Sequence, residues 1–131
     1  TASYLALNTN IAIPAMGSAS VTATCVSPPF TSFWWLSTRT HRFATQSKIS
    51  DGSTTLVVSD DWAHPTIAQF SPANFHAFPS NGITHDCSYV NPTANVIQYG
   101  ESETTDETCM SIGFFFPAAH PAICYNGSGP F

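Results

Sequence analysis

The segment Phe33-Trp-Trp-Leu-Ser-Thr-Arg-Thr-His-Arg-Phe43 decides the fold class of this chain. Aromatic residues fill its first half, and Arg39, His41 and Phe43 occupy alternate positions in its second half. Aromatic side chains favour strands, and a period of two places alternate side chains on one face of a sheet. We therefore predict a long strand over residues 33–43 that presents Arg39, His41 and Phe43 on the same face.

Short strands are also predicted along the rest of the chain. Apolar and β-branched runs lie at residues 3–13, 21–25, 54–59, 66–70, 75–78, 83–90, 95–99 and 110–116. Ten prolines and seven glycines punctuate these runs and disfavour long helices. About eight or nine short strands are typical of an antiparallel β-sandwich or jelly roll. Its length of 131 residues predicts one domain over residues 1–131, with a loose tail at 125–131.

Charge and hydropathy exclude several classes of function. Charged residues make up 8% of the chain, against about 25% in a typical soluble domain. The net charge of −5 comes with no basic stripe, which argues against nucleic-acid binding. No apolar run approaches the roughly 20 residues of a transmembrane helix. Because charge is depleted at interface centres, such a surface favours association with copies of itself.

Four cysteines, Cys25, Cys87, Cys109 and Cys124, lack the close spacing of zinc or thioredoxin-like sites. Two disulfides formed in an oxidising compartment explain them better, so we expect a protein that is secreted, extracellular or on the cell surface. The residues alone leave three pairings open.

Several motifs then occur in an order and spacing that resemble one known family. They are Ile11-Ala-Ile-Pro14, Arg39-Thr-His-Arg42, Asp86-Cys-Ser-Tyr89, Gly100, Glu107-Thr-Cys109 and Phe114-Phe-Phe-Pro117. From about Tyr4 to about Cys124 the chain resembles the C-terminal domain of the copper type II, ascorbate-dependent monooxygenases, which include peptidylglycine α-hydroxylating and dopamine β-monooxygenases. The resemblance implies two disulfides, Cys25–Cys124 and Cys87–Cys109.

In that family, this domain binds the catalytic copper through two histidines of a His-x-His strand and a methionine just before the later cysteine. The soft thioether and the imidazoles suit copper that cycles between two oxidation states. By resemblance, the former copper site of this chain is Arg39, His41 and Thr108, so one ligand of three is retained. The family's activity also needs a first domain with a second copper, which 131 residues do not encode.

We therefore expect a secreted module without catalytic residues or a cofactor, with a structural or binding role and with copies of itself as partners. One alternative is a copper-dependent monooxygenase or oxidase fragment in which His41 binds the metal with Met110 or His85 as a substitute ligand. Another is a module that binds a glycan or another small ligand on exposed aromatic rings.

Two further features could contribute to such surfaces. The period of a strand places adjacent residues on opposite sides, so one ring of the Trp34-Trp35 pair is expected to face outward or into the sheet edge, as an assembly contact. Arg39 and Arg42 could pair with the acidic loop at residues 100–108, although exposed ion pairs contribute only about 0–1 kcal/mol.

Overall fold

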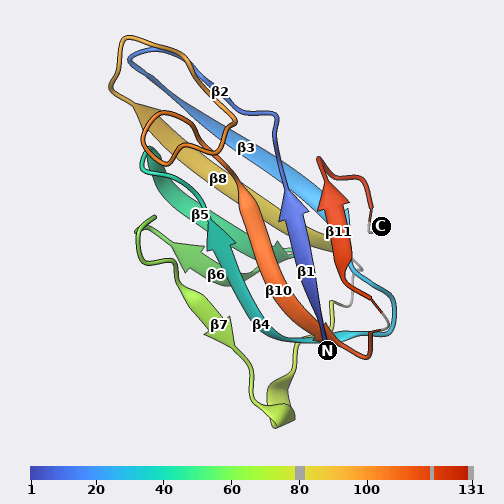
Figure 1. Ribbon diagram of the computed structural model, residues 1–131. Helices are drawn as coiled ribbons and strands as arrows, with labels where there is room; N and C mark the ends of the chain where they lie inside the picture. The colour runs from blue at the N-terminus through green and yellow to red at the C-terminus, as the bar shows by residue number, and fades with distance from the viewer. Residues whose placement is uncertain (79–81, 119, 130–131) are drawn as a thin grey trace.

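The computed structural model describes residues 1–78, 82–118 and 120–129, and it consists of layered β-sheets (Figure 1). One sheet has the strand order β11-β1-β10-β4-β7, the other has the order β3-β8-β5-β6, and β2 and β9 form a separate pair. The strand pairs of the two large sheets are antiparallel, except that β1 and β11 are parallel. The all-β class predicted from the sequence is confirmed.

The elements within the described residues are short. They are β1 (Ala2–Leu7), β2 (Ala12–Ile13), β3 (Gly17–Val26), β4 (Ser32–Arg39), β5 (Ala44–Asp51), β6 (Thr54–Ser59), β7 (Ile67–Gln69), the 3₁₀ helix η1 (Pro72–Asn74), β8 (Gly82–Asn91), β9 (Ile97–Gln98), β10 (Met110–Phe116) and β11 (Ala122–Tyr125). Over these residues, no helix is long and apolar enough to cross a membrane.

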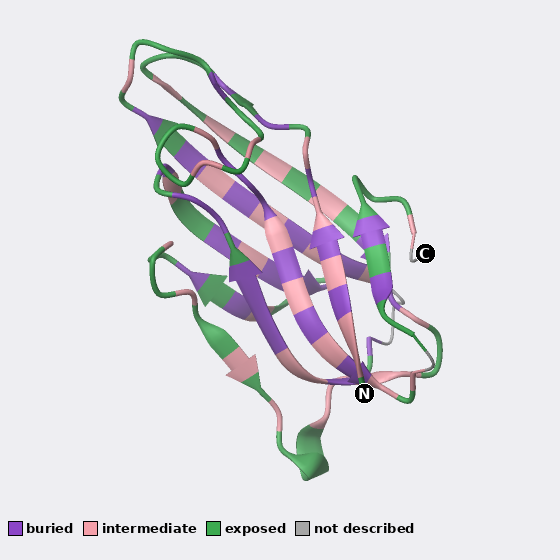
Figure 2. Ribbon diagram, viewed as in Figure 1, coloured by how far each residue is buried: buried purple, intermediate pink, exposed green. Residues whose placement is uncertain are grey.

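The core lies between the two large sheets and follows from strand alternation. Along β10, every second residue is buried, and β8 shows the same period along most of its length (Figure 2). Phe33 at the centre packs edge-on against Tyr4, with ring centroids 5.6 Å apart. A Cβ atom at Gly113 would lie 2.9 Å from both Phe33 and Leu36, so glycine at this position leaves the room that the Phe33 ring occupies.

Both disulfides connect the two large sheets. Cys25 on β3 is bonded to Cys124 on β11, and Cys87 on β8 is bonded to Cys109, which directly precedes β10. The pairing implied by the resemblance is thereby confirmed. Each crosslink holds the layers together at a different place along the sandwich.

The Trp34-Trp35 pair departs from simple alternation. Phe114 pairs with Trp35 and Phe115 pairs with Phe33, so Trp34 is the extra residue of a β-bulge. Both indole rings lie with their centroids 5.3 Å from that of Phe114. The two tryptophans therefore share the outer side of the sheet, and the expectation that they face opposite sides is wrong.

Other differences concern segment boundaries. The predicted strand at residues 75–78 is reduced to a single bridge between His76 and Phe33 after the turn η1. Residues 122–125 form β11, which the sequence did not predict. Tyr125 and Ser128 exchange two backbone hydrogen bonds, which differs from the loose tail predicted for 125–131. Residues 130 and 131 of that tail lie outside the described residues.

Candidate functional site

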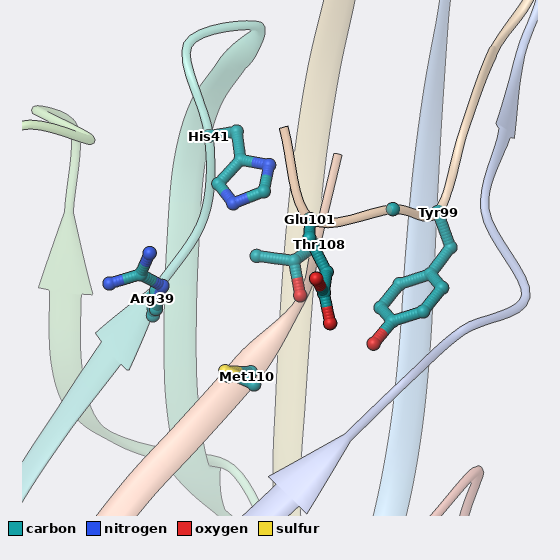
Figure 3. A pocket seen from close by; sticks show the side chains of 7 residues that line it. Arg39, His41, Tyr99, Glu101, Thr108 and Met110 are labelled. Carbon is teal, nitrogen blue, oxygen red and sulfur yellow. The ribbon is translucent and has the colours of Figure 1, made fainter. Parts of the chain in front are cut away.

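The pocket that contains His41 lies where β4 ends and β10 begins (Figure 3). Its volume is about 290 Å³, and its lining is Arg39, His41, Tyr99, Gly100, Glu101, Thr108 and Met110. Arg39 and Met110 are directly paired across β4 and β10. The structure thus gathers the three positions that the resemblance assigns to copper ligands, together with Met110, around one space.

The imidazole of His41 is buried and fixed in orientation. Its Nδ1 lies 2.9 Å from the backbone carbonyl oxygen of Asp106. A carbonyl only accepts hydrogen bonds, so Nδ1 carries the proton that it donates, and Nε2 of the neutral ring keeps its lone pair. Figure 3 shows the ring directed toward the space between Arg39 and Thr108. His41 can therefore accept a hydrogen bond or bind a metal through Nε2.

The carboxylate of Glu107 holds the chain around His41. Its two oxygens accept the backbone N–H groups of His41 and Phe43, each at 2.8 Å, and Glu107 has no exposed surface. Burial raises the pKa of the Glu107 carboxyl, and the N–H groups of His41, Phe43 and Thr108 partly offset that effect. Two backbone donors that would continue the β4 ladder are thus bound by this side chain.

This arrangement corrects the predicted strand over residues 33–43. β4 ends at Arg39, and residues 40–43 turn before β5 begins at Ala44. Phe43 packs in a smaller core cluster with Cys87 and Cys109 and does not line the His41 pocket. From the sequence, Glu107 is grouped with the acidic loop at residues 100–108. The sequence could have indicated this burial, because residues two positions apart in an extended segment point to the same side, and Glu107 is two positions before the buried Cys109.

The loop between β9 and β10 is compact at Gly100 and Asp106. The side chain of Asp106 accepts the Ser102 N–H at 3.2 Å, and the Asp106 N–H donates to the Ser102 carbonyl at 3.0 Å. A Cβ atom at Gly100 would lie 2.8 Å from the Asp106 Cβ, closer than real side chains approach. Glycine at position 100 therefore allows Asp106 to reach His41.

The two arginines near the pocket have different contacts. The Arg39 guanidinium lies 3.2 Å from Glu103, and both side chains are about half exposed. Arg42 instead lies over the Phe43 ring, 4.8 Å from its centroid. The expected pairing with the acidic loop is confirmed for Arg39. An exposed pair of this kind adds little stability, about 0–1 kcal/mol.

The residues of the pocket do not match the ligand set of the monooxygenases. Only His41 and Met110 offer an imidazole and a thioether, whereas Arg39 offers a permanent cation and Thr108 a hydroxyl. The Thr108 Oγ1 atom is buried without a hydrogen-bond partner among the described residues. Over the same residues, no three His, Cys, Asp or Glu side chains form a metal-binding group. The lining therefore does not fit the copper site of that family.

His85, the other substitute ligand considered, lies away from this lining. It is buried on β8 with its Nδ1 2.9 Å from the Ser111 hydroxyl, and no described residue is a partner of its Nε2. Burial lowers the pKa of His85 to about 4. Of the two substitutes, the structure brings only Met110 into the pocket of His41.

Comparison with family models and with curated proteins finds no match for this chain.

Proposed function

We propose that the chain is a secreted, non-catalytic β-sandwich module with a structural or binding role, which assembles with copies of itself. The observation that carries the proposal is the pocket at Arg39, His41 and Thr108. The three side chains line one pocket, but two of them are poor ligands for copper.

The charge of Arg39 supports the absence of a catalytic metal. A guanidinium stays protonated in proteins, and it repels a cation placed beside it. Arg39 lines the same pocket as His41, and Glu103 neutralises it only at an exposed position. A second cation in this pocket would therefore face an unfavourable charge.

The disulfides support the proposed location. Cys25–Cys124 and Cys87–Cys109 account for every cysteine of the chain. Structural disulfides persist in oxidising compartments and are rare in the reducing cytosol. A secreted or surface-exposed module is the simplest setting for this framework.

The test combines metal content with mass. The purified chain is incubated with copper, dialysed, and measured for copper per chain and for particle mass by light scattering. We expect no retained copper and a mass above that of one 14.0 kDa chain. One tightly held copper per chain in a monomeric particle would overturn the proposal.

The second candidate is a copper enzyme fragment that binds the metal through His41 and Met110. The specific observation in its favour is that both side chains line one pocket. It predicts a Cu(II) electron paramagnetic resonance signal that disappears in His41→Ala and persists in the matched control His64→Ala, since His64 is exposed. An unchanged metal content in His41→Ala would exclude this candidate.

A further inference from the structure

The buried end of the His41 pocket contains two polar atoms that have no partner among the described residues. Nε2 of His41 keeps its lone pair, because Nδ1 donates to the Asp106 carbonyl. The Thr108 Oγ1 atom is buried without a hydrogen bond, and Thr108 lines the same pocket. His41 is 2% exposed and Thr108 is 3% exposed. Because buried polar groups are nearly always hydrogen-bonded, the two atoms indicate that this pocket holds a polar group.

A hydroxyl group meets the needs of both atoms. It can donate its proton to Nε2 of His41 and accept the proton of the Thr108 hydroxyl, since a hydroxyl has one proton and two lone pairs. A carboxylate has no proton to donate to Nε2. An ammonium group has protons, but it would lie in the same pocket as the Arg39 guanidinium. The buried end of the pocket therefore favours an uncharged O–H group.

The rest of the lining favours a ligand without net charge. Arg39 and Glu101 both line the pocket, and Figure 3 shows their side chains there together with the phenol of Tyr99. An anion would be repelled by Glu101 and a cation by Arg39. The hydroxyls of a neutral ligand, by contrast, can accept from the guanidinium and donate to the carboxylate. A ligand with several hydroxyls would thus find partners around this space.

The size of the pocket limits the size of the ligand. Its volume is about 290 Å³, and small-molecule pockets range from about 300 to 1,000 Å³. The His41 pocket is therefore at the lower end of this range, which suits a ligand the size of one sugar ring. A sugar ring carries hydroxyls on adjacent carbons, and its C–H groups can contact the apolar side chain of Met110, which lines the same pocket.

We propose that the His41 pocket binds one unit of a neutral carbohydrate, with one sugar hydroxyl between His41 Nε2 and the Thr108 hydroxyl. This inference rests on the proposed binding role of the module, and it names the site and the chemical class of the ligand. The site is separate from the aromatic cluster of Trp34, Trp35 and Phe114, since none of these rings lines the pocket.

The first test removes the Thr108 hydroxyl. Thr108→Val keeps the shape of the side chain, and it breaks no hydrogen bond among the described residues, so the variant should fold. The matched control Thr24→Val removes an exposed hydroxyl on β3 of the other sheet. Each chain is titrated with glucose, galactose, mannose and N-acetylglucosamine, and saturation-transfer NMR measures the dissociation constants. We expect wild type and Thr24→Val to bind the same sugar equally, and Thr108→Val to bind it at least about fivefold more weakly.

The second test observes His41 directly. In the chain labelled with ¹⁵N-histidine, a hydrogen bond accepted by Nε2 shifts the signal of this nitrogen. The sugar that binds should shift the His41 signal and leave that of the exposed His64 unchanged. Acetate, methylammonium and glycine, added as an anion, a cation and a zwitterion, should shift neither signal.

Three results would overturn the proposal. Wild type that binds none of the four sugars would leave the pocket to water only. A sugar that binds Thr108→Val as tightly as wild type, or binds without shifting the His41 signal, would place carbohydrate binding elsewhere. A shift caused by one of the charged compounds would exclude a neutral ligand as the pocket's specific class. None of these results changes the copper content or the particle mass, which test the proposed function separately.

Discussion

Glu107 and His41 lie 66 positions apart in the sequence, and the Glu107 carboxylate accepts the His41 backbone N–H at 2.8 Å. The same carboxylate accepts the Phe43 N–H at 2.8 Å. The end of β4 and the start of the pocket therefore depend on a side chain from a distant loop.

Replacing Glu107 by Gln should destabilise the fold. Only one of the two terminal atoms of glutamine accepts hydrogen bonds, so either His41 or Phe43 loses its buried partner. A buried donor left without a partner costs about 1–3 kcal/mol, and we expect the free energy of unfolding in urea to fall by that amount. The control Glu103→Gln, in an exposed pair, should change it by less than about 1 kcal/mol. Equal effects of both variants would contradict the role given to Glu107.

His85 should make the stability depend on pH. Its pKa is lowered from 6.5 to about 4 by burial, so between these values the unfolded chain binds a proton that the folded chain does not. Stability from this group is complete above pH 6.5 and is lost as the pH falls toward 4, by up to about 3 kcal/mol. Unfolding measured across this range should show a smaller slope in His85→Leu than in wild type. An exposed-histidine control, His64→Gln, should keep the wild-type slope.

The two disulfides should differ in their contribution. Cys25–Cys124 closes a loop of 99 residues and Cys87–Cys109 one of 22. Chain entropy predicts that removing the first costs about 4.7 kcal/mol and removing the second about 3 kcal/mol. Urea unfolding of the two double alanine variants tests this order. A larger loss for Cys87→Ala/Cys109→Ala would show that local packing around the pocket outweighs loop length.

Placing the monooxygenase ligand types in this pocket should create a copper site. Arg39 and Thr108 line the same pocket as His41, so Arg39→His with Thr108→Met would place two imidazoles and a thioether around it. We expect about one copper per chain in this double variant. The control Arg39→Lys with Thr108→Leu, which offers neither an added imidazole nor a thioether, should retain none. Failure of the folded double variant to bind copper would count against the resemblance on which these positions rest.

The sequence predicted those parts of the fold that local pattern controls. The strand predicted at residues 110–116 forms β10, and the disulfide pairing carried by the family resemblance is present. It failed where a distant group decides the local conformation. β4 ends at Arg39 because the Glu107 carboxylate accepts the backbone N–H groups of His41 and Phe43. β11 forms because residues 122–125 pair in parallel with β1 at the other end of the chain.

The candidate site shows the same contrast between residues that the sequence indicates and residues whose position depends on distant contacts. Resemblance named Arg39, His41 and Thr108, and these residues do share a pocket with Met110. The residues that hold His41 in place, Asp106 through its carbonyl and Glu107 through its carboxylate, were grouped with the solvated acidic loop. Their burial depends on how the loop folds over the end of β4, which no local pattern encodes.

The β-bulge at Trp34 absorbs one extra residue, so the residues after it in β4 keep their regular pairing with β10. Phe33 and Leu36 are three residues apart and both are fully buried, which regular alternation forbids. Deleting Trp34 would leave a regular strand in which Phe33 and Leu36 still face the interior and Arg39 still faces outward. The bulge therefore accommodates one additional outward ring without moving Arg39 from the mouth of the His41 pocket.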